Sequence, residues 1–105
     1  MPYSKTLTQV ENWINGKEST SANPRWIEKY NPHSGKLMSI FIRSSAAHVN
    51  RAVLSAQKEF LNWSNLTSVS RGQFLMQVAQ EMKVQKKLLA KCVSVETGKK
   101  LSDAM

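Results

Sequence analysis

Apolar residues recur at helical spacing through the second half of the chain, from position 49 onward. Intervals of four and three residues place them on one side of a helix. This pattern predicts an amphipathic first helix over 45–64, which Ser44 or Ser45 can cap. Its apolar stripe consists of Val49, Val53, Ala56, Phe60 and Trp63.

A second helical segment is predicted over 68–98, where the same spacing continues. Its apolar positions form two groups, separated by the polar stretch Lys83–Lys87, so we expect a break near residue 85. Gly98 ends the segment, because glycine readily adopts the left-handed conformation after a helix. The two groups are Phe74, Leu75, Val78, Ala79 and Met82, followed by Leu88, Leu89, Cys92 and Val93.

The first part of the chain is predicted to be a small antiparallel β-meander over 13–43, preceded by a loose N-terminal arm over 1–12. Asn15–Gly16 suits a two-residue hairpin turn, in which both residues need a positive φ. Arg25–Tyr30 and Lys36–Arg43 have the length and composition of strands. The turn between them contains a proline and a glycine, both of which favour a reversal of the chain.

The chain is basic, with 15 Lys and Arg against seven Asp and Glu and a net charge of +8. Lys83, Lys87 and Lys91 follow at helical spacing and predict a solvated basic stripe. Nucleic-acid binding is a weaker interpretation, because no aromatic residues alternate with these lysines. No apolar run approaches the roughly 20 residues that a membrane span requires, so we expect no membrane partner.

No catalytic constellation can be assembled from these residues. No Gly-Lys pair is followed by Ser or Thr, which excludes a nucleotide P-loop. His33 and His48 lack metal-ligand spacing, and a solvated loop position is the simpler interpretation of His33. The single cysteine, Cys92, is predicted to be a buried and inert thiol. Met1–Trp13 lacks the apolar core of a signal peptide, so the expected compartment is reducing and cytoplasmic.

The predicted elements look like part of a larger domain. A globule of about 100 residues has a radius of gyration of about 13 Å. Helices with one apolar stripe each, together with a small meander, cannot cover one another's stripes within that size. Trp63, Phe74 and the Leu88–Leu89 pair therefore need apolar surfaces that 105 residues do not supply.

Six short motifs, in order and over roughly residues 13–104, make the chain resemble the N-terminal portion of the NAD(P)-dependent aldehyde dehydrogenase superfamily. It departs from the family pattern at His48 and Asn50, where the family has acids, and at Lys100, where it has proline. The motifs are Ile14-Asn15-Gly16-Lys17, Asn31-Pro32-His33-Ser34-Gly35-Lys36, Arg51-Ala52-Val53 with Ala56, Phe60 with Trp63, Arg71 with Leu75 and Ala79, and Glu96-Thr97-Gly98-Lys99.

The resemblance implies an α/β fold of which residues 13–105 form an incomplete part. It implies an enzyme that oxidises a small-molecule aldehyde to a carboxylic acid with NAD or NADP, and that acts as a homo-oligomer. In the family, the catalytic and cofactor-binding residues lie beyond the matching segment, so this chain alone is expected to be inactive. Some members bind a structural monovalent cation, and the corresponding residues here are Lys29, Tyr30 and Glu96.

Two further hypotheses stay open beside the N-terminal fragment of a dehydrogenase. The first is a truncated, non-enzymatic interaction protein, whose amphipathic helices would bind a parent enzyme or another helix. Its binding surface would be the stripe formed by Phe74, Leu75, Val78 and Met82. The second is a small basic nucleic-acid binder, which the spread of basic residues from Lys5 to Lys100 disfavours.

Overall fold

The computed structural model describes residues 7–19 and 21–105. They form two compact units. One contains residues 7–19 and 21–30 together with Lys36–Phe60, and the other contains Asn31–Gly35 together with Leu61–Met105. Of the arm predicted over 1–12, residues 1–6 lie outside the described residues.

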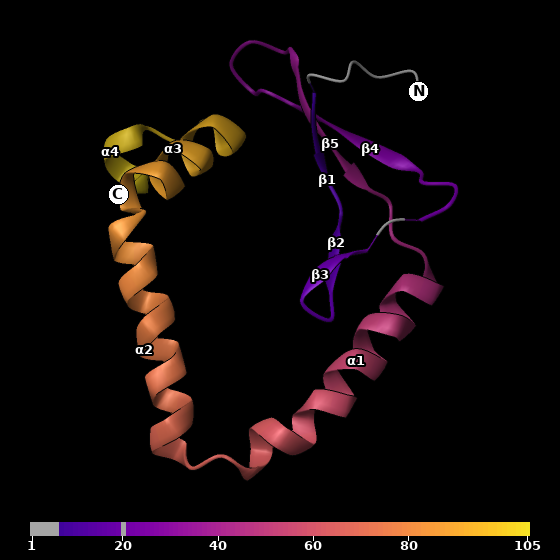
Figure 1. Cartoon of the computed structure of the whole chain (residues 1–105). Coiled ribbons are helices and arrows are strands. Elements are labelled where there is room, and N and C mark those ends of the chain that lie inside the picture. The colour runs from indigo at the N-terminus through magenta and orange to yellow at the C-terminus, as the bar shows by residue number, and fades with distance from the viewer. Residues whose placement is uncertain (1–6, 20) are drawn as a thin grey trace. The chain divides into compact units, whose positions relative to one another are not determined.

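The first unit contains a three-stranded sheet in the order β1-β5-β4 (Figure 1). Strand β4 (Trp26–Tyr30) runs antiparallel to β5 (Leu37–Ile42), as the sequence predicts. Strand β1 (Thr8–Val10) lies parallel to β5, with Thr8 opposite Ser39. The strand pairings within the predicted meander, residues 13–43, are antiparallel as expected, and β1 lies before them, in the stretch predicted as an arm. Three residues are too few to show an alternating pattern, and a pairing 31 positions away leaves no local signal.

A separate hairpin consists of β2 (Asn12–Ile14) and β3 (Lys17–Ser19). Its two turn residues both have positive φ, 56° at Asn15 and 73° at Gly16. This is the backbone of the hairpin turn that Asn-Gly favours, because its twist matches the twist of the paired strands. The prediction of a hairpin at this dipeptide is confirmed.

Helix α1 (Ala46–Asn65) leads through a short corner into α2 (Ser68–Val84). The Thr67 hydroxyl accepts a hydrogen bond from the Ser70 amide at 3.2 Å, so the N-cap is Thr67. The Arg71 guanidinium donates to the Leu66 carbonyl at 2.8 Å. The Trp63 and Phe74 rings face each other across the corner, with centroids 5.9 Å apart. Two hydrogen bonds and one aromatic pair thus fix the corner.

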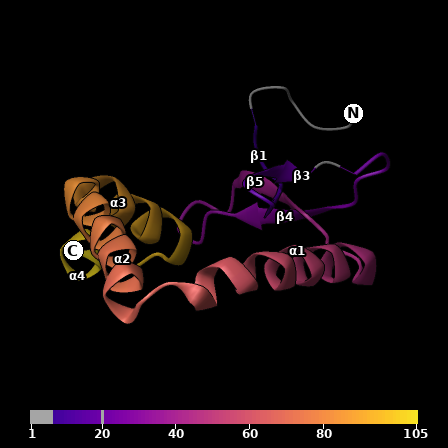
Figure 2. The same cartoon turned by 60° about the horizontal axis from the view of Figure 1, so that its bottom comes forward.

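Helix α3 (Lys86–Thr97) begins directly after a break at Gln85, where the sequence pattern predicts one. The Gln85 amide closes α2 by donating to the Glu81 carbonyl at 3.0 Å, and the Gln85 side chain donates to the Glu81 carboxylate. A single turn, α4 (Leu101–Ala104), lies beside α3 in both views (Figures 1 and 2).

Very little of the described chain is buried. Within residues 7–19 and 21–105, the buried apolar side chains are Ile40, Ile42 and Ala90 alone. Large apolar residues are exposed on all three long helices, and Trp13 of the hairpin is 71% exposed. The side-chain oxygen Oε2 of Glu11 is shielded and has no hydrogen-bond partner in the structure. Together these features show an incomplete domain, because a finished one buries its large apolar groups and satisfies its buried polar atoms.

Cys92 is exposed on α3, so the prediction of a buried thiol is wrong. Leu88, Leu89 and Val93 lie near it in sequence, and all three are exposed as well. The four lysines of the basic stretch, Lys83, Lys86, Lys87 and Lys91, are exposed as expected. Among the helices that the structure describes, none has the length and apolar character needed to cross a membrane.

Candidate functional site

The Asn31–Gly35 turn is held by its own first residue. The side-chain oxygen Oδ1 of Asn31 accepts from the backbone amides of His33 at 2.8 Å and Ser34 at 3.1 Å. The Asn31 carbonyl accepts from the Gly35 amide at 2.8 Å, and Gly35 has a φ of 67°. Asparagine is suited to this position because its short amide can replace a backbone acceptor within a turn.

The end of α3 is equally well defined. Gly98 has a φ of 74°, and its amide donates to the Ser94 carbonyl at 3.0 Å. The Thr97 hydroxyl donates to the Val93 carbonyl at 2.7 Å and accepts from the Lys99 amide at 3.2 Å. A left-handed residue at this position ends the helix and satisfies one of its last carbonyls.

These two segments contact each other, although 65 positions separate His33 from Gly98. A Cβ atom placed on Gly98 would lie 3.3 Å from Nε2 of His33 and 3.4 Å from Cγ of Pro32. The site that we call the turn–stop junction consists of Asn31–Gly35 and Thr97–Gly98. Glycine suits position 98, because its φ of 74° strains residues with a side chain and because a Cβ would lie tightly against the His33 ring. The junction therefore joins two motifs that the sequence presents separately.

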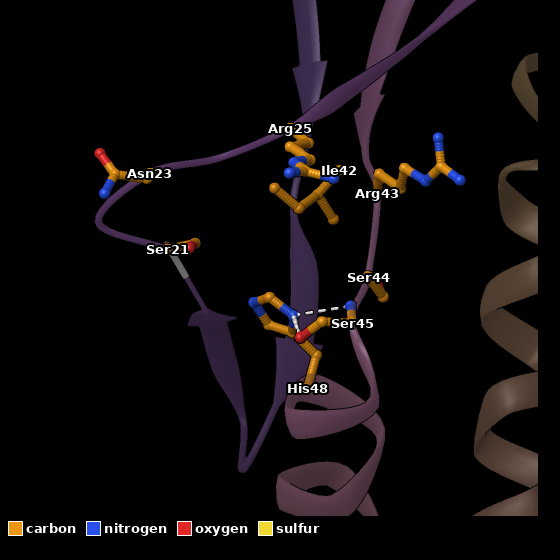
Figure 3. Close-up of a pocket in the computed structure, with 8 residues that line it drawn as sticks. All are labelled: Ser21, Asn23, Arg25, Ile42, Arg43, Ser44, Ser45 and His48. Atoms are coloured by element: carbon orange, nitrogen blue, oxygen red, sulfur yellow. Dashed lines mark hydrogen bonds between the residues drawn. The ribbon is translucent and has the colours of Figure 1, made fainter.

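A second candidate is a hollow of about 320 Å³ at the start of α1 (Figure 3). Nδ1 of His48 accepts from the Ser45 amide at 3.0 Å and lies 2.8 Å from the Ser45 hydroxyl. His48 is the third residue of α1, and it therefore does what a glutamate does in a capping box. The hollow is lined by Ser21, Asn23, Arg25, Ile42, Arg43, Ser44, Ser45 and His48.

Neither candidate contains a carboxylate or a thiol, and Nδ1 of His48 is already engaged in capping α1. The junction contains one imidazole, which is exposed, as predicted for a loop histidine. Within the described residues, no three His, Cys, Asp or Glu side chains come together to hold a metal ion. Both sites have a structural role that the hydrogen bonds define, one in a helix cap and the other in a turn.

Removing the His48 imidazole is expected to weaken the start of α1. A lost N-terminal cap costs about 1 kcal/mol, so His48→Ala should lower helicity in a peptide of residues 43–66. His48→Glu should restore it, because a glutamate at this position accepts the same bond and favours the positive end of the helix dipole. Far-UV circular dichroism measures the helicity of the His48→Ala and His48→Glu peptides, with Asn50→Ala as the matched control. Equal helicity in wild type and His48→Ala would contradict the capping role.

The residues proposed for a monovalent cation lie at the ends of two elements. Lys29 and Tyr30 end β4, at a β-bulge in its pairing with β5. Glu96 is exposed in the last turn of α3, directly before Thr97. A bulge re-aims backbone groups, and a carbonyl-plus-carboxylate set is the donor chemistry that a hard cation prefers. The backbone carbonyls of Lys29 and Tyr30 and the carboxylate of Glu96 are therefore suitable donors for a monovalent cation.

The strands, the helices and the small core define the class of protein: an incomplete part of a larger domain that contains both helices and strands. A family model described as "Aldehyde dehydrogenase family" matches residues 18–105. The chain belongs to the aldehyde dehydrogenase family.

Individual relatives agree with this assignment. A human mitochondrial protein, methylmalonate-semialdehyde/malonate-semialdehyde dehydrogenase (acylating), is 29% identical over 97% of this chain and 19% of its own length. The structure of PnpE in complex with nicotinamide adenine dinucleotide matches with a TM-score of 0.87 and 29% identity, over 92% of this chain and 20% of that one. The structure of a Staphylococcus aureus betaine aldehyde dehydrogenase in complex with NAD⁺ matches with a TM-score of 0.84 and 27% identity. The match covers 93% of this chain and 20% of that one.

The chain spans about a fifth of the length of these relatives. Sequence reasoning identified the family from the motifs, but it did not find the contact between His33 and Gly98. Both motifs contain a glycine suited to positive φ, which predicts a turn at each. It does not predict that the two turns contact each other. The His48 cap could have been found, since the residue stands three positions after a serine that can cap a helix.

Proposed function

We propose that this chain is the N-terminal part of an enzyme that oxidises an aldehyde to a carboxylic acid with NAD or NADP. The family match over residues 18–105 carries the proposal, and the NAD complexes among its structural neighbours support it. The bound dinucleotide would accept a hydride from the substrate. The residues of this chain would instead provide a rigid support, built from the turn–stop junction and the α1–α2 corner.

The 105-residue chain is expected to produce no aldehyde-dependent NADH. Its one thiol, Cys92, is exposed on a helix, and among the described residues it belongs to no group of three His, Cys, Asp or Glu side chains. A longer protein that begins with this segment should be active in the same absorbance assay at 340 nm. Activity of the short chain, abolished by Cys92→Ser, would overturn the assignment of catalysis to the missing part.

For the substrate, we propose a semialdehyde. Several relatives are named methylmalonate- or malonate-semialdehyde dehydrogenases, among them a Shouchella clausii protein 30% identical over 93% of this chain. The longer protein should then show a higher kcat/KM with malonate semialdehyde than with betaine aldehyde. Some of these relatives are named as acylating, so the assay is run with and without a thiol acyl acceptor. A preference for betaine aldehyde would reject the semialdehyde proposal and leave the family assignment intact.

We further propose that Glu96 and the backbone of Lys29 and Tyr30 hold a structural monovalent cation in the longer protein. A ligand that binds only the folded state stabilises it, by about 2.7 kcal/mol at a hundredfold excess over Kd. Replacing Na⁺ or K⁺ by tetramethylammonium should therefore lower the Tm of the wild type. Glu96→Gln should remove this dependence, whereas Glu81→Gln should not. An unchanged salt dependence in Glu96→Gln would reject the site.

The interaction-protein hypothesis remains the alternative, and the exposed apolar stripe on α2 favours it. Whether the chain is a dehydrogenase segment or an interaction protein, we place it in the cytoplasm, in keeping with its single exposed thiol. We expect the longer protein to form a homo-oligomer. Cell fractionation and sedimentation of the native protein test these two proposals. A mitochondrial location would reject the first proposal, and a monomer would reject the second.

A further inference from the structure

We propose that Asn15 is the site of a spontaneous covalent modification, the deamidation of its side-chain amide by the backbone nitrogen of Gly16. The substrate is the chain itself, and water is the one co-reactant. The reaction requires no cofactor and no partner, so it goes beyond the proposed function and does not depend on it.

The reaction proceeds in two balanced steps. In the first, the Gly16 nitrogen forms a bond to Cγ of Asn15, and the bond from Cγ to Nδ2 breaks. The proton lost by the Gly16 amide leaves with Nδ2 as ammonia, and the product is a five-membered cyclic imide. In the second step, water opens the imide at one of its two carbonyl carbons, which restores the N–H and gives either aspartate or isoaspartate. No group is oxidised or reduced.

The dipeptide Asn15-Gly16 is sterically open to this attack. Gly16 has no Cβ, so its own residue does not hinder the approach of its nitrogen to the Asn15 side chain. Each of the other asparagines precedes either a residue with a large side chain or a proline, which has no N–H to lose. These other asparagines are Asn12, Asn23, Asn31, Asn50, Asn62 and Asn65.

The surroundings of Asn15 leave its amide open to reaction. Asn15 and Gly16 are both exposed, and they line a hollow of about 440 Å³ beside α1, so water reaches the reacting carbon. A Cβ placed on Gly16 would have nothing within 4 Å, which shows that no neighbouring group shields its backbone. Asn12 differs, because its Oδ1 accepts a hydrogen bond from the Ser44 hydroxyl at 3.0 Å, whereas the Asn15 side chain has no hydrogen-bond partner among the described residues.

The hairpin must open before the ring can close. The φ of 56° at Asn15 is left-handed, and in the ideal left-handed conformation the next backbone nitrogen points away from the side chain. Strands β2 and β3 have only three residues each, and Trp13 between them and solvent is 71% exposed. An isolated two-stranded hairpin is marginally stable in water, so opening is frequent and supplies the reactive conformation.

The two products affect the hairpin differently. Aspartate followed by glycine suits the same two-residue turn, so this product keeps the hairpin. Isoaspartate takes the backbone through Cβ and Cγ and lengthens it by one carbon atom, so the turn no longer matches the pairing of Trp13 with Glu18. Both products add a negative charge to a chain whose net charge is +8, and cation-exchange chromatography therefore separates them from the unmodified chain.

The test incubates the purified 105-residue chain in mildly alkaline buffer and follows its tryptic peptide of residues 6–17 by mass spectrometry. This peptide contains both Asn12 and Asn15, so Asn12 serves as the internal control. We expect deamidation at Asn15 to be at least about tenfold faster than at Asn12, with aspartate and isoaspartate both formed. Gly16→Ala should slow the reaction at Asn15 by about tenfold, whereas the matched control Gly35→Ala should leave its rate unchanged.

Equal rates at Asn12 and Asn15, or an unchanged rate in Gly16→Ala, would overturn the proposal. A second incubation in urea tests the opening of the hairpin. Urea should raise the rate at Asn15 by less than about tenfold, because so small a hairpin already opens readily without it. A larger increase would show that the folded hairpin protects Asn15, and the proposal would fail for the native chain. The activity of the longer protein tests the proposed function separately, so the two can fail independently.

Discussion

Heating the 105-residue chain is expected to give a gradual loss of helical signal without a cooperative step. Cooperative unfolding requires a shared core, and the described part of the chain buries only Ile40, Ile42 and Ala90 among its apolar side chains. The free energy of unfolding is the small difference between the stabilisation from burying apolar groups and the loss of conformational entropy. Three buried residues cannot offset the entropy lost by a chain of this length. The helices should form only partly, because isolated helices of 12 to 20 residues are marginal in water.

Circular dichroism at 222 nm and tryptophan fluorescence measure this directly. Both signals should change smoothly with temperature, and the near-ultraviolet spectrum should be weak because Trp13 is exposed. The longer protein is the control and should show a sharp transition. Coincident sigmoidal curves from both probes on the short chain would show that it folds alone, which so small a core does not allow.

Replacing Gly98 by alanine in the longer protein is expected to be strongly destabilising. A φ of 74° costs an alanine about 1–2 kcal/mol. The new Cβ would also lie 3.3 Å from the His33 ring and 3.4 Å from Pro32, so the ring would have to shift slightly and the contact between the two segments would change. The effect should reach both the end of α3 and the Asn31–Gly35 turn, since they share this contact.

Gly35→Ala is the matched control. Gly35 has a similar φ of 67°, but a Cβ at this position would have nothing within 4 Å, so only the backbone cost applies. Denaturant unfolding of the two variants of the longer protein should show Gly98→Ala to be the less stable. A double variant, Gly98→Ala with His33→Ala, should recover part of that difference. Equal losses for Gly98→Ala and Gly35→Ala would show that the turn–stop junction contributes nothing to stability.

Local patterns predicted much of the fold. The helices α1, α2 and α3 lie where the apolar spacing indicates them, and the break falls at Gln85. The Asn15–Gly16 hairpin followed from one dipeptide. In each case neighbouring residues decide the conformation, through side-chain periodicity or through the φ that a turn demands.

Features that depend on distant residues were not predicted. Nothing in Thr8–Val10 shows that it pairs in parallel with β5, and nothing near His33 shows that it contacts Gly98. Cys92 looks buried by pattern and is exposed, because a local pattern does not show whether another segment covers it. The same limit applies to the function: the motifs indicate the family, but they do not identify residues that would perform its chemistry.

The most direct test of the central claim is the apparent mass of the native protein. An immunoblot of the source cells, with an antibody against residues 64–87, detects whatever polypeptide carries this segment. Because the chain covers about a fifth of its relatives, we predict a band about five times heavier than 11.9 kDa. A sole band near 11.9 kDa would contradict the account and make the interaction protein the hypothesis to pursue.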